Sequence, residues 1–338
     1  MTAAHGVCVV LALGLVMLGT VDDVLSGSFH WRASQPLIAP APPPGETWTA
    51  LKDPSVVFYA GRWHLFCTLR APNTPTRTVY LSFADWADAA GAEQRVLPFR
   101  NTSYAAPEVF YFEPQKKWYL ICQASDPSWE PKYQPAYSTS DDIADPASWA
   151  PLKPLGAHQT AGGKTGLDFW IICGEAKVYL FFTSLDGHMW REETRLEDFP
   201  AGWSEAKLAI EGDIFEAGHT YCLKGLGKYL TLVKAQGGHG WRYYKAYLAD
   251  RLDGNWQPIA ATKDKCFASM SNVEQPGGRW TDSISHGELL RAGVDQHLEV
   301  DPARLRLLFQ GVSDADRAGK AYGQIPWRLG ILEPQPAQ

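Results

Sequence analysis

The sequence has little of what marks a metal-binding or nucleic-acid-binding protein. Its 338 residues include only six Cys, and these show no CxxC or Cys/His spacing of the kind that binds zinc. Acidic residues outnumber basic ones, 37 to 31, and the net charge of −6 argues against nucleic acid as a partner. Helical periodicity is also scarce, with residues 84–94 as the best short candidate. With 45% apolar and 20% charged residues, the chain is expected to be globular and rich in β-structure.

Long hydrophobic runs are scarce too. The apolar run at residues 7–18 is too short to span a bilayer as one helix, and at this place it predicts a secretory signal. We expect residues 1–27 to be a signal peptide, with small residues at 26–28 for cleavage. A hydrophobic N-terminal helix and a misassigned start are the alternatives, because residues 1–6 carry no Lys or Arg. The mature chain, residues 28–338, is expected to be secreted to the extracellular space and to have no membrane association.

Removal of the leader would leave five Cys, an odd number that rules out a complete set of disulfides. Cys67, Cys122, Cys173 and Cys222 lie inside apolar runs. The simplest interpretation is that they are small buried thiols within strands.

Aromatic residues are abundant, at 12% with 14 Trp, which is typical of all-β folds. Five segments each place a polar residue just ahead of, or early in, an apolar strand-like run, at spacings of 55, 60, 48 and 70 residues. These polar residues are Asp53, Glu108, Asp168, Glu216 and His286. Each run is followed by a turn or connection and a second apolar strand, at 63–69, 118–124, 178–184, 229–235 and 304–312. Outer strands are predicted at 78–83, 135–140, 188–194 and 243–249.

Repeats of this size, each with several strands, predict an all-β fold, a five-bladed β-propeller. A β-sandwich and two unrelated β domains are the alternatives. No Pro/Ser-rich linker divides residues 28–338, so we expect one catalytic domain.

The centre of such a propeller would be acidic. Asp53, Asp168 and Glu216 would meet where the inner strands begin, and crowding raises the pKa of at least one carboxyl group. One proton donor and one ionised base are what glycoside hydrolysis requires. A cation site and structural capping of strand ends remain open on these residues alone.

Several longer motifs resemble glycoside hydrolase family 62. They are SFHWRASQPLI, LKDPSVVFYAGRWHLF, APEVFYFEPQKKWYLI, STSDDIADPASW, LDFWIIC, FEAGHTY, WTDSISHGELLR, LFQG and IPWRLGIL. They run in unbroken order from about residue 28 to residue 332. FHWRASQPLI and WTDSISHGELLR are highly specific, whereas related five-bladed families share KDPSVV. The resemblance implies a five-bladed propeller and an α-L-arabinofuranosidase acting on arabinoxylan with inversion of configuration.

The resemblance also implies a role for each carboxylate. Asp53 matches the general base, Glu216 the general acid, and Asp168 the carboxylate that orients the acid and tunes its pKa. An inverting pair stands roughly 6.5–9.5 Å apart, which leaves room for a water molecule. Lys52 matches a residue that contacts the bound arabinose.

Other positions carry weaker expectations. His286 matches a histidine near a structural calcium ion on the propeller axis, with a hydrogen-bonded histidine and no metal as the alternative. Tyr322 resembles a Tyr that shapes the substrate pocket, and Trp129 an aromatic near the sugar. Glu108 is expected near the sugar contacts but stands where the family usually has Gln. No organic cofactor is expected.

Three further departures bear on specificity. Gly323 replaces an expected Asn, and the loops at 70–77 and 158–166, which should rim the pocket, differ from the family pattern. The sequence therefore predicts a monomeric, exo-acting enzyme that removes arabinofuranosyl branches from arabinoxylan or its oligosaccharides. A related glycosidase acting on arabinan or xylo-oligosaccharides and a non-catalytic carbohydrate-binding propeller are the alternatives.

Overall fold

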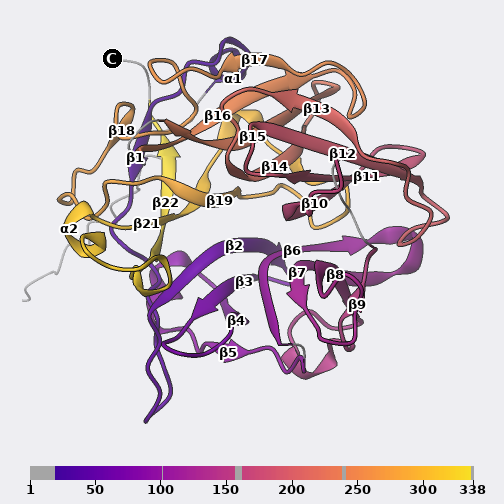
Figure 1. Ribbon diagram of the computed structural model, residues 1–338. Coiled ribbons are helices and arrows are strands. Elements are labelled where there is room, and N and C mark those ends of the chain that lie inside the picture. The colour runs from indigo at the N-terminus through magenta and orange to yellow at the C-terminus, as the bar shows by residue number, and fades with distance from the viewer. Residues whose placement is uncertain (1–19, 101, 157–161, 238–240, 336–338) are drawn as a thin grey trace, which may run out of the picture.

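Five β-sheets surround a common centre in the computed structural model, which describes residues 20–100, 102–156, 162–237 and 241–335 (Figure 1). An inner strand of each sheet faces this centre, and the strands that follow it outward are antiparallel, except for the last strand of the fifth sheet, which pairs in parallel. The predicted five-bladed β-propeller is therefore confirmed.

The first three blades are each built from one continuous stretch of chain. The first contains β2 (Ala50–Tyr59), β3 (Arg62–Arg70), β4 (Arg77–Phe83) and β5 (Arg95–Val96). The second contains β6 (Ser103–Phe112), β7 (Lys117–Ser125), β8 (Tyr133–Ser140) and β9 (Lys153–Pro154). The third contains β10 (Leu167–Cys173), β11 (Lys177–Thr183), β12 (His188–Arg195) and β13 (Lys207–Glu211).

The last two blades add strands from distant parts of the chain. The fourth contains β14 (Glu216–Leu223), β15 (Lys228–Gly237), β16 (Trp241–Ala249) and β17 (Gln257–Ala260), with β20 (Glu299–Val300) added in parallel beside β14. The fifth contains β19 (Ser285–Leu289), β21 (Leu307–Gly311), β22 (Arg328–Pro334), β1 (Trp31–Ala33) and β18 (Val273–Glu274). The chain thus closes its own ring, because β1 from near one end pairs with β22 from near the other.

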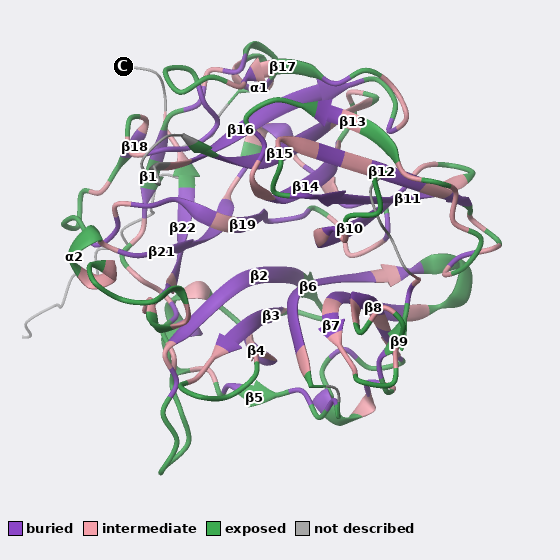
Figure 2. Ribbon diagram, in the orientation of Figure 1, coloured by how far each residue is buried: buried purple, intermediate pink, exposed green. Residues whose placement is uncertain are grey.

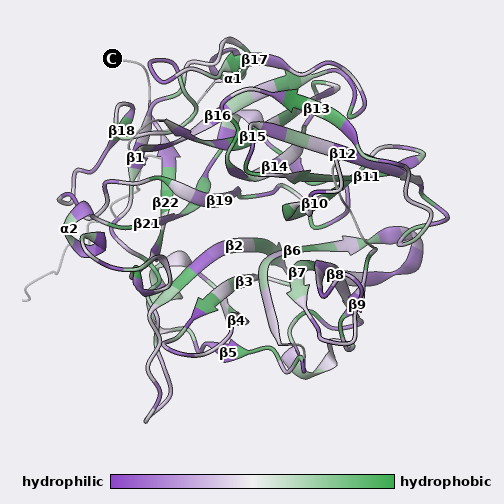
Figure 3. Ribbon diagram, viewed as in Figure 1, coloured by the Kyte–Doolittle hydropathy of each residue, from purple (hydrophilic) through white to green (hydrophobic). Residues whose placement is uncertain are grey.

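The apolar runs of the sequence become the inner and second strands of the blades. These strands are almost wholly buried, and exposure is concentrated in the connecting turns (Figure 2). Hydrophobic residues line the same strands, while polar residues gather in the loops (Figure 3). Burial on both faces explains why these runs read as continuous apolar segments rather than as alternating ones. The five predicted pairs of strands and the four predicted outer strands are all present.

Every inner strand contains a β-bulge near its start. The pairing register shifts by one residue between Lys52 and Ser55 in β2, and the four other inner strands shift at the corresponding place. In four of the blades, a residue at or in the bulge has the left-handed backbone conformation, with φ between 48° and 56°. These residues are Asp53, Ala106, Asp168 and Ala217. A bulge redirects a side chain that a regular strand would point elsewhere.

Helices are few and short. Residues 86–91, inside the stretch predicted as the best helix, form a 3-10 helix, Trp86–Gly91, capped by the Asp85 side chain. The two α-helices in the described residues are α1 (Val21–Ser26) and α2 (Asp314–Arg317). No helix in this part of the chain is long and apolar enough to cross a membrane.

The helix α1 lies within the segment predicted to be a signal peptide. Thr20 caps it, Val24 is buried against the propeller, and the Lys265 side chain donates a hydrogen bond to the Ser26 carbonyl oxygen at 2.7 Å. Residues 1–19, which include the apolar run, lie outside the described residues, so the signal peptide stays a prediction.

The cysteines follow the simplest interpretation of the sequence. Cys67, Cys122 and Cys173 are buried free thiols within strands, and Cys222 is half-buried. Cys266, the fifth in the described residues, is also a buried free thiol.

Candidate active site

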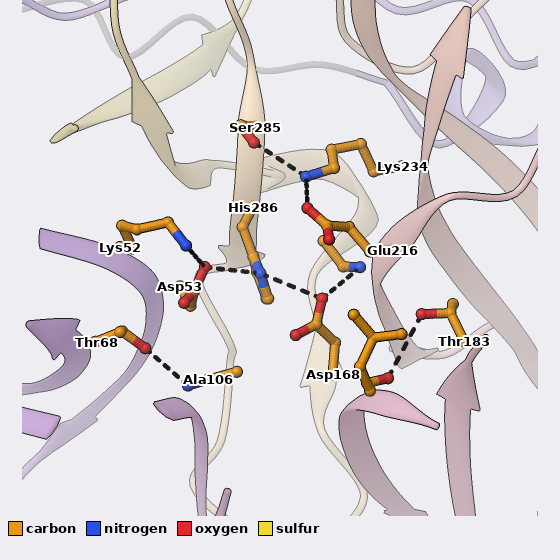
Figure 4. A network of polar contacts seen from close by, with 12 residues as sticks. Lys52, Asp53, Thr68, Ala106, Asp168, Thr183, Glu216, Lys234, Ser285 and His286 are labelled. Carbon is orange, nitrogen blue, oxygen red and sulfur yellow. Dashed lines mark hydrogen bonds and ion pairs between the residues drawn. The ribbon is translucent and has the colours of Figure 1, made fainter. Parts of the chain in front are cut away.

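The polar residues that open the inner strands converge at the hub of the propeller. Asp53 comes from β2, Asp168 from β10, Glu216 from β14 and His286 from β19. Figure 4 shows His286 between Asp53 and Asp168, with Glu216 on the neighbouring side. Asp53 and Asp168 are themselves bulge residues, and the Glu216 bulge residue is the following Ala217. The bulges therefore aim these carboxylates toward the centre.

Asp53 is surrounded by cations. Its Oδ1 lies 3.0 Å from His286 Nδ1 and 3.5 Å from Lys52 Nζ, and its backbone N–H donates to Gln310 Oε1 at 2.8 Å. Burial alone would raise the pKa of Asp53, but the charges of Lys52 and His286 outweigh it and hold that pKa well below its usual range. Asp53 is therefore an ionised carboxylate, ready to accept a proton.

Asp168 has the opposite character. Burial raises its pKa, and the neighbouring carboxylates of Glu216 and Asp53 add to that effect against the opposing charge of His286. Its Oδ2 accepts a hydrogen bond from the backbone N–H of Ala217 at 2.9 Å. Asp168 therefore fixes the backbone directly after Glu216, and in its ionised form it places a negative charge beside that residue.

Glu216 is paired with a lysine that the sequence motifs do not single out. Its Oε1 accepts from Lys234 Nζ at 2.5 Å. Burial would raise the pKa of Glu216, but the charge and hydrogen bond of Lys234 outweigh it and lower that pKa. In the absence of substrate, Glu216 is thus an ionised partner of Lys234 rather than a proton donor at rest.

His286 acts as a cation between two acids. Burial opposes its charge, yet Asp53 and Asp168 together raise its pKa. Among the described residues, no cluster of three or more His, Cys, Asp and Glu side chains could hold a metal ion. Calcium takes six to eight oxygen ligands, so an ion beside His286 would depend mainly on water. The calcium ion stays a prediction.

The predicted sugar contacts Lys52 and Tyr322 lie together. Lys52 Nζ is 4.9 Å from the centroid of the Tyr322 ring, which is half exposed on a short 3-10 helix, Tyr322–Gln324. A Cβ atom at Gly323 would stand 2.5 Å from Arg70 Nη2. Nη2 is the far end of the flexible Arg70 side chain, so a larger residue at position 323 would require only a shift of Arg70, and steric exclusion does not explain the glycine.

Glu108 lies deeper, where its two oxygens are bonded within the protein. Oε2 accepts from the Ile171 backbone N–H at 2.7 Å, and Oε1 lies 3.0 Å from His219 Nε2. Burial raises the pKa of Glu108 to about 8 and lowers that of His219 to about 4. A cavity of about 20 Å³, which Asp168 and His286 also line, lies beside them. Glu108 is thus a neutral acid on the axis, and its contacts connect blades two, three and four.

The other expected positions are Trp129 and the two loops predicted to rim the pocket. Trp129 is half-buried on the loop between β7 and β8, where it packs against the hydrophobic cluster of the first two blades. The loop at 70–77 connects β3 to β4. Residues 158–161 of the second predicted rim loop lie outside the described residues.

The sequence motifs do not single out three further residues that lie near the three carboxylates. Lys234 is fully buried, Arg242 donates to Ser285 Oγ at 3.2 Å, and Tyr133 has its pKa raised by burial and by the nearby Asp168. The charge of Lys234 at the end of an apolar strand was a visible signal. Its pairing with Glu216 depends on register across two strands, which spacing alone does not reveal.

The protein is a five-bladed propeller, and its hub brings together carboxylates that differ in pKa. These two features together indicate the class of propeller glycoside hydrolases. Comparison with known proteins places the chain within that class. Residues 30–333 match the family described as Glycosyl hydrolase family 62, and the chain belongs to that family.

The relatives of the chain are arabinofuranosidases. It is 38% identical over 315 residues to alpha-L-arabinofuranosidase C of Cellvibrio japonicus, a match that covers 91% of this chain and 47% of that protein. The chain thus spans about half the length of this relative. Two solved structures match with a TM-score of 0.84 and 36% identity over 91% of this chain and 98% of theirs. They are the catalytic domain of a GH62 alpha-L-arabinofuranosidase from Coprinopsis cinerea and the Podospora anserina arabinofuranosidase PaAbf62A in complex with cellotriose.

A third solved structure, a GH62 hydrolase in complex with xylotriose, matches with a TM-score of 0.83 at 33% identity. A thermostable family-43 glycoside hydrolase matches with a TM-score of 0.59 at 15% identity, which is a likeness of fold alone.

Proposed function

We propose that the protein is an exo-acting α-L-arabinofuranosidase that removes arabinofuranosyl side chains from arabinoxylan with inversion. The observation that carries this proposal is the unequal ionisation of three carboxyl groups at one hub. Asp53 is held ionised and the pKa of Asp168 is raised, while Glu216 is ion-paired beside them. Membership of family 62 and arabinofuranosidase relatives support the same activity.

In the proposed reaction, Asp53 takes a proton from a water molecule. The water oxygen forms a bond to the anomeric carbon as the bond from that carbon to the leaving oxygen breaks. Glu216 reacts in its protonated form, which it reaches by taking up a proton from solvent. It gives that proton to the leaving oxygen, and a single displacement of this kind inverts the anomeric centre. Asp168 positions the backbone after Glu216, and in its ionised form its negative charge favours the protonated form of Glu216.

Replacement of either reacting carboxylate tests the roles. We expect Asp53→Ala and Glu216→Ala each to lower kcat on arabinoxylan by at least about 10²-fold, because each removes a proton-transfer group. The released sugar, followed by NMR, should appear first as the anomer opposite to the bound one. Retained anomeric configuration, or full activity in either variant, would contradict the mechanism. Unchanged thermal unfolding serves as the control for folding.

The preferred backbone is the second question, because the loop at 70–77 and Gly323 are expected to depart from the family pattern. A panel of arabinoxylan, arabinan and xylo-oligosaccharides, each assayed for released sugar, separates the proposed activity from a related glycosidase. Binding to xylan without any product would instead indicate a carbohydrate-binding propeller. The xylotriose complex of a relative supports a xylan backbone. We expect the enzyme to act as a secreted monomer.

A further inference from the structure

Lys234 is a lysine with no exposed surface in the fourth blade. Its side chain is 0% exposed, on β15. It stands directly opposite Glu216 of β14 in the antiparallel pairing, at the register position just before the bulge. Side chains directly opposite each other on neighbouring strands are in contact distance. The pairing of β14 with β15 therefore places Lys234 next to the Glu216 carboxylate.

Lys234 binds one carboxylate oxygen of Glu216 and leaves the other without a hydrogen bond from the described residues. Nζ donates to Glu216 Oε1 at 2.5 Å and to Ser285 Oγ at 3.1 Å, which ties the pair to the inner strand of the fifth blade (Figure 4). No described residue donates a hydrogen bond to Glu216 Oε2. One oxygen is thus fixed within the protein while the other remains available to a ligand.

Stability alone does not explain a buried ion pair. Well-packed apolar residues in place of such a pair are often neutral or stabilising, because desolvation offsets the attraction. Here the pair joins a lysine without solvent contact to a carboxylate that retains 15% side-chain exposure at the hub. The partner that reaches solvent is the carboxylate to which the reaction assigns proton donation, so the pair points to a role in the reaction.

We propose that Lys234 is a positioning residue that holds Glu216 Oε1, so that Oε2 faces the oxygen of the leaving sugar. This inference rests on the proposed function, since it needs Glu216 to be the general acid. Lys234 does not touch substrate itself. It fixes the rotation of the carboxyl group and sets the charge around it.

Charged groups from several elements face Glu216. Lys234 on β15, Arg242 on β16 and Lys52 on β2 favour its ionised form, and Asp168 on β10 opposes them. His286 on β19 lies between Asp53 and Asp168, with Glu216 on the neighbouring side. Lys234 exerts the largest electrostatic effect among the cations, and that effect lowers the pKa of Glu216. Its removal therefore raises this pKa, and the protonated acid then persists to higher pH.

The leaving group provides the decisive test. A sugar alcohol leaving from arabinoxylan needs a proton, whereas an activated phenol, as in a 4-nitrophenyl arabinofuranoside, departs without one. We expect Lys234→Met to lower kcat on arabinoxylan by about 10²-fold, within the range for general acid catalysis. The same variant should lose less than about fivefold on the activated substrate, since Asp53 still activates water. The alkaline limb of the pH profile on arabinoxylan should move to higher pH.

Lys245→Met is the matched control. Lys245 is another buried lysine, on the adjacent strand β16, where it pairs with Val233. It should leave both the leaving-group ratio and the alkaline limb as in the wild type, with only a change in thermal unfolding. Equal losses of Lys234→Met on both substrates, with an unmoved alkaline limb, would overturn the positioning role. A wild-type enzyme that releases no arabinose from either substrate would instead overturn the proposed function.

Discussion

Glu108 is a buried acid whose protonation the fold enforces. At neutral pH it is largely protonated, because its pKa is raised to about 8, and its partner His219 is neutral, with a pKa lowered to about 4. A glutamine in its place would keep the same pattern. Its amide oxygen could accept from Ile171, and its amide nitrogen could donate to His219 as the protonated acid does.

Glu108→Gln should therefore stabilise the protein in a pH-dependent manner. The pKa of Glu108 rises from 4.5 in its ordinary state to about 8 in the fold, so the folded state binds the proton more tightly than the unfolded chain. Stability from this group is complete below pH 4.5 and falls until pH 8, at about 1.4 kcal/mol per unit of pKa difference. The variant should match the wild type near pH 4.5 and exceed it increasingly toward pH 8.

Thermal unfolding across this pH range measures the effect. Glu113→Gln, at an exposed position of the following turn, serves as the control and should leave the pH dependence unchanged. Parallel curves for the wild type and Glu108→Gln would show that Glu108 ionises normally in the fold.

For single residues, the sequence predicts which side chains carry the chemistry better than it predicts which side chains they contact. Asp53, Asp168 and Glu216 could be found because each is a carboxylate at the start of an apolar run. The pairs Lys234–Glu216 and His286–Asp53 could not, because strand register and bulge geometry bring them together. The lowered pKa of Glu216 was unforeseen for the same reason.

The bulged inner strand is the element that shapes the hub. Ala106 occupies the bulge of β6 with φ of 51°, a left-handed conformation that costs a residue with a Cβ roughly 1–2 kcal/mol. The neighbouring Ala105 is also a buried alanine in the same strand, and it is not among the residues with positive φ. The two alanines therefore differ chiefly in backbone conformation.

Glycine substitution at the two positions should separate backbone strain in the folded protein from added flexibility of the unfolded chain. Ala105→Gly is expected to destabilise the protein by about 0.5–1 kcal/mol through added freedom of the unfolded chain. Ala106→Gly should be neutral or stabilising, because relief of the left-handed strain offsets that cost. Denaturant unfolding of both variants measures the difference, and an equal loss at both positions would contradict bulge strain.

The hairpins could be predicted from the sequence and the bulges could not. Apolar runs separated by turn residues predict paired strands, and all five pairs occur. A left-handed residue is commonly signalled by glycine, but these bulges use Asp, which is a weaker signal, and Ala, which gives none. The fold overrides local preference here, at the place where the carboxylates must be aimed.

Closure of the ring of five blades is a property of the whole molecule, and the buried side chain of Trp31 stabilises it. Trp31 is 2% exposed in β1, where its Nε1 donates to the Phe267 carbonyl oxygen at 2.5 Å and its ring lies 5.0 Å from that of Phe267. β1 itself joins β22 on one side and β18 on the other. A side chain of this size fills the core of the blade that seals the ring.

Trp31→Ala should destabilise the protein by about 3–5 kcal/mol, as expected for removal of a buried aromatic side chain. Phe58→Ala is the control, because Phe58 is an aromatic residue of β2 that is 47% exposed. The loss should appear in denaturant unfolding, and a similar small effect for both variants would argue against closure through β1.

The number of blades was predictable and their closure was not. Five repeats follow from the spacing of the polar residues, since each repeat carries its own pair of strands. The short strand β1 has no repeat of its own, and its partner β22 lies at the other end of the described chain. Only the folded ring shows that the two belong to one sheet.

This pairing has a consequence for the order in which the protein forms during synthesis. The first three blades are complete once their own stretches of chain have left the ribosome. β1 is synthesised before all of them, yet it cannot pair with β22 until β22 has been synthesised. Trp31, which is buried in the closed ring, therefore lacks its neighbouring strand β22 until the last blade has been synthesised.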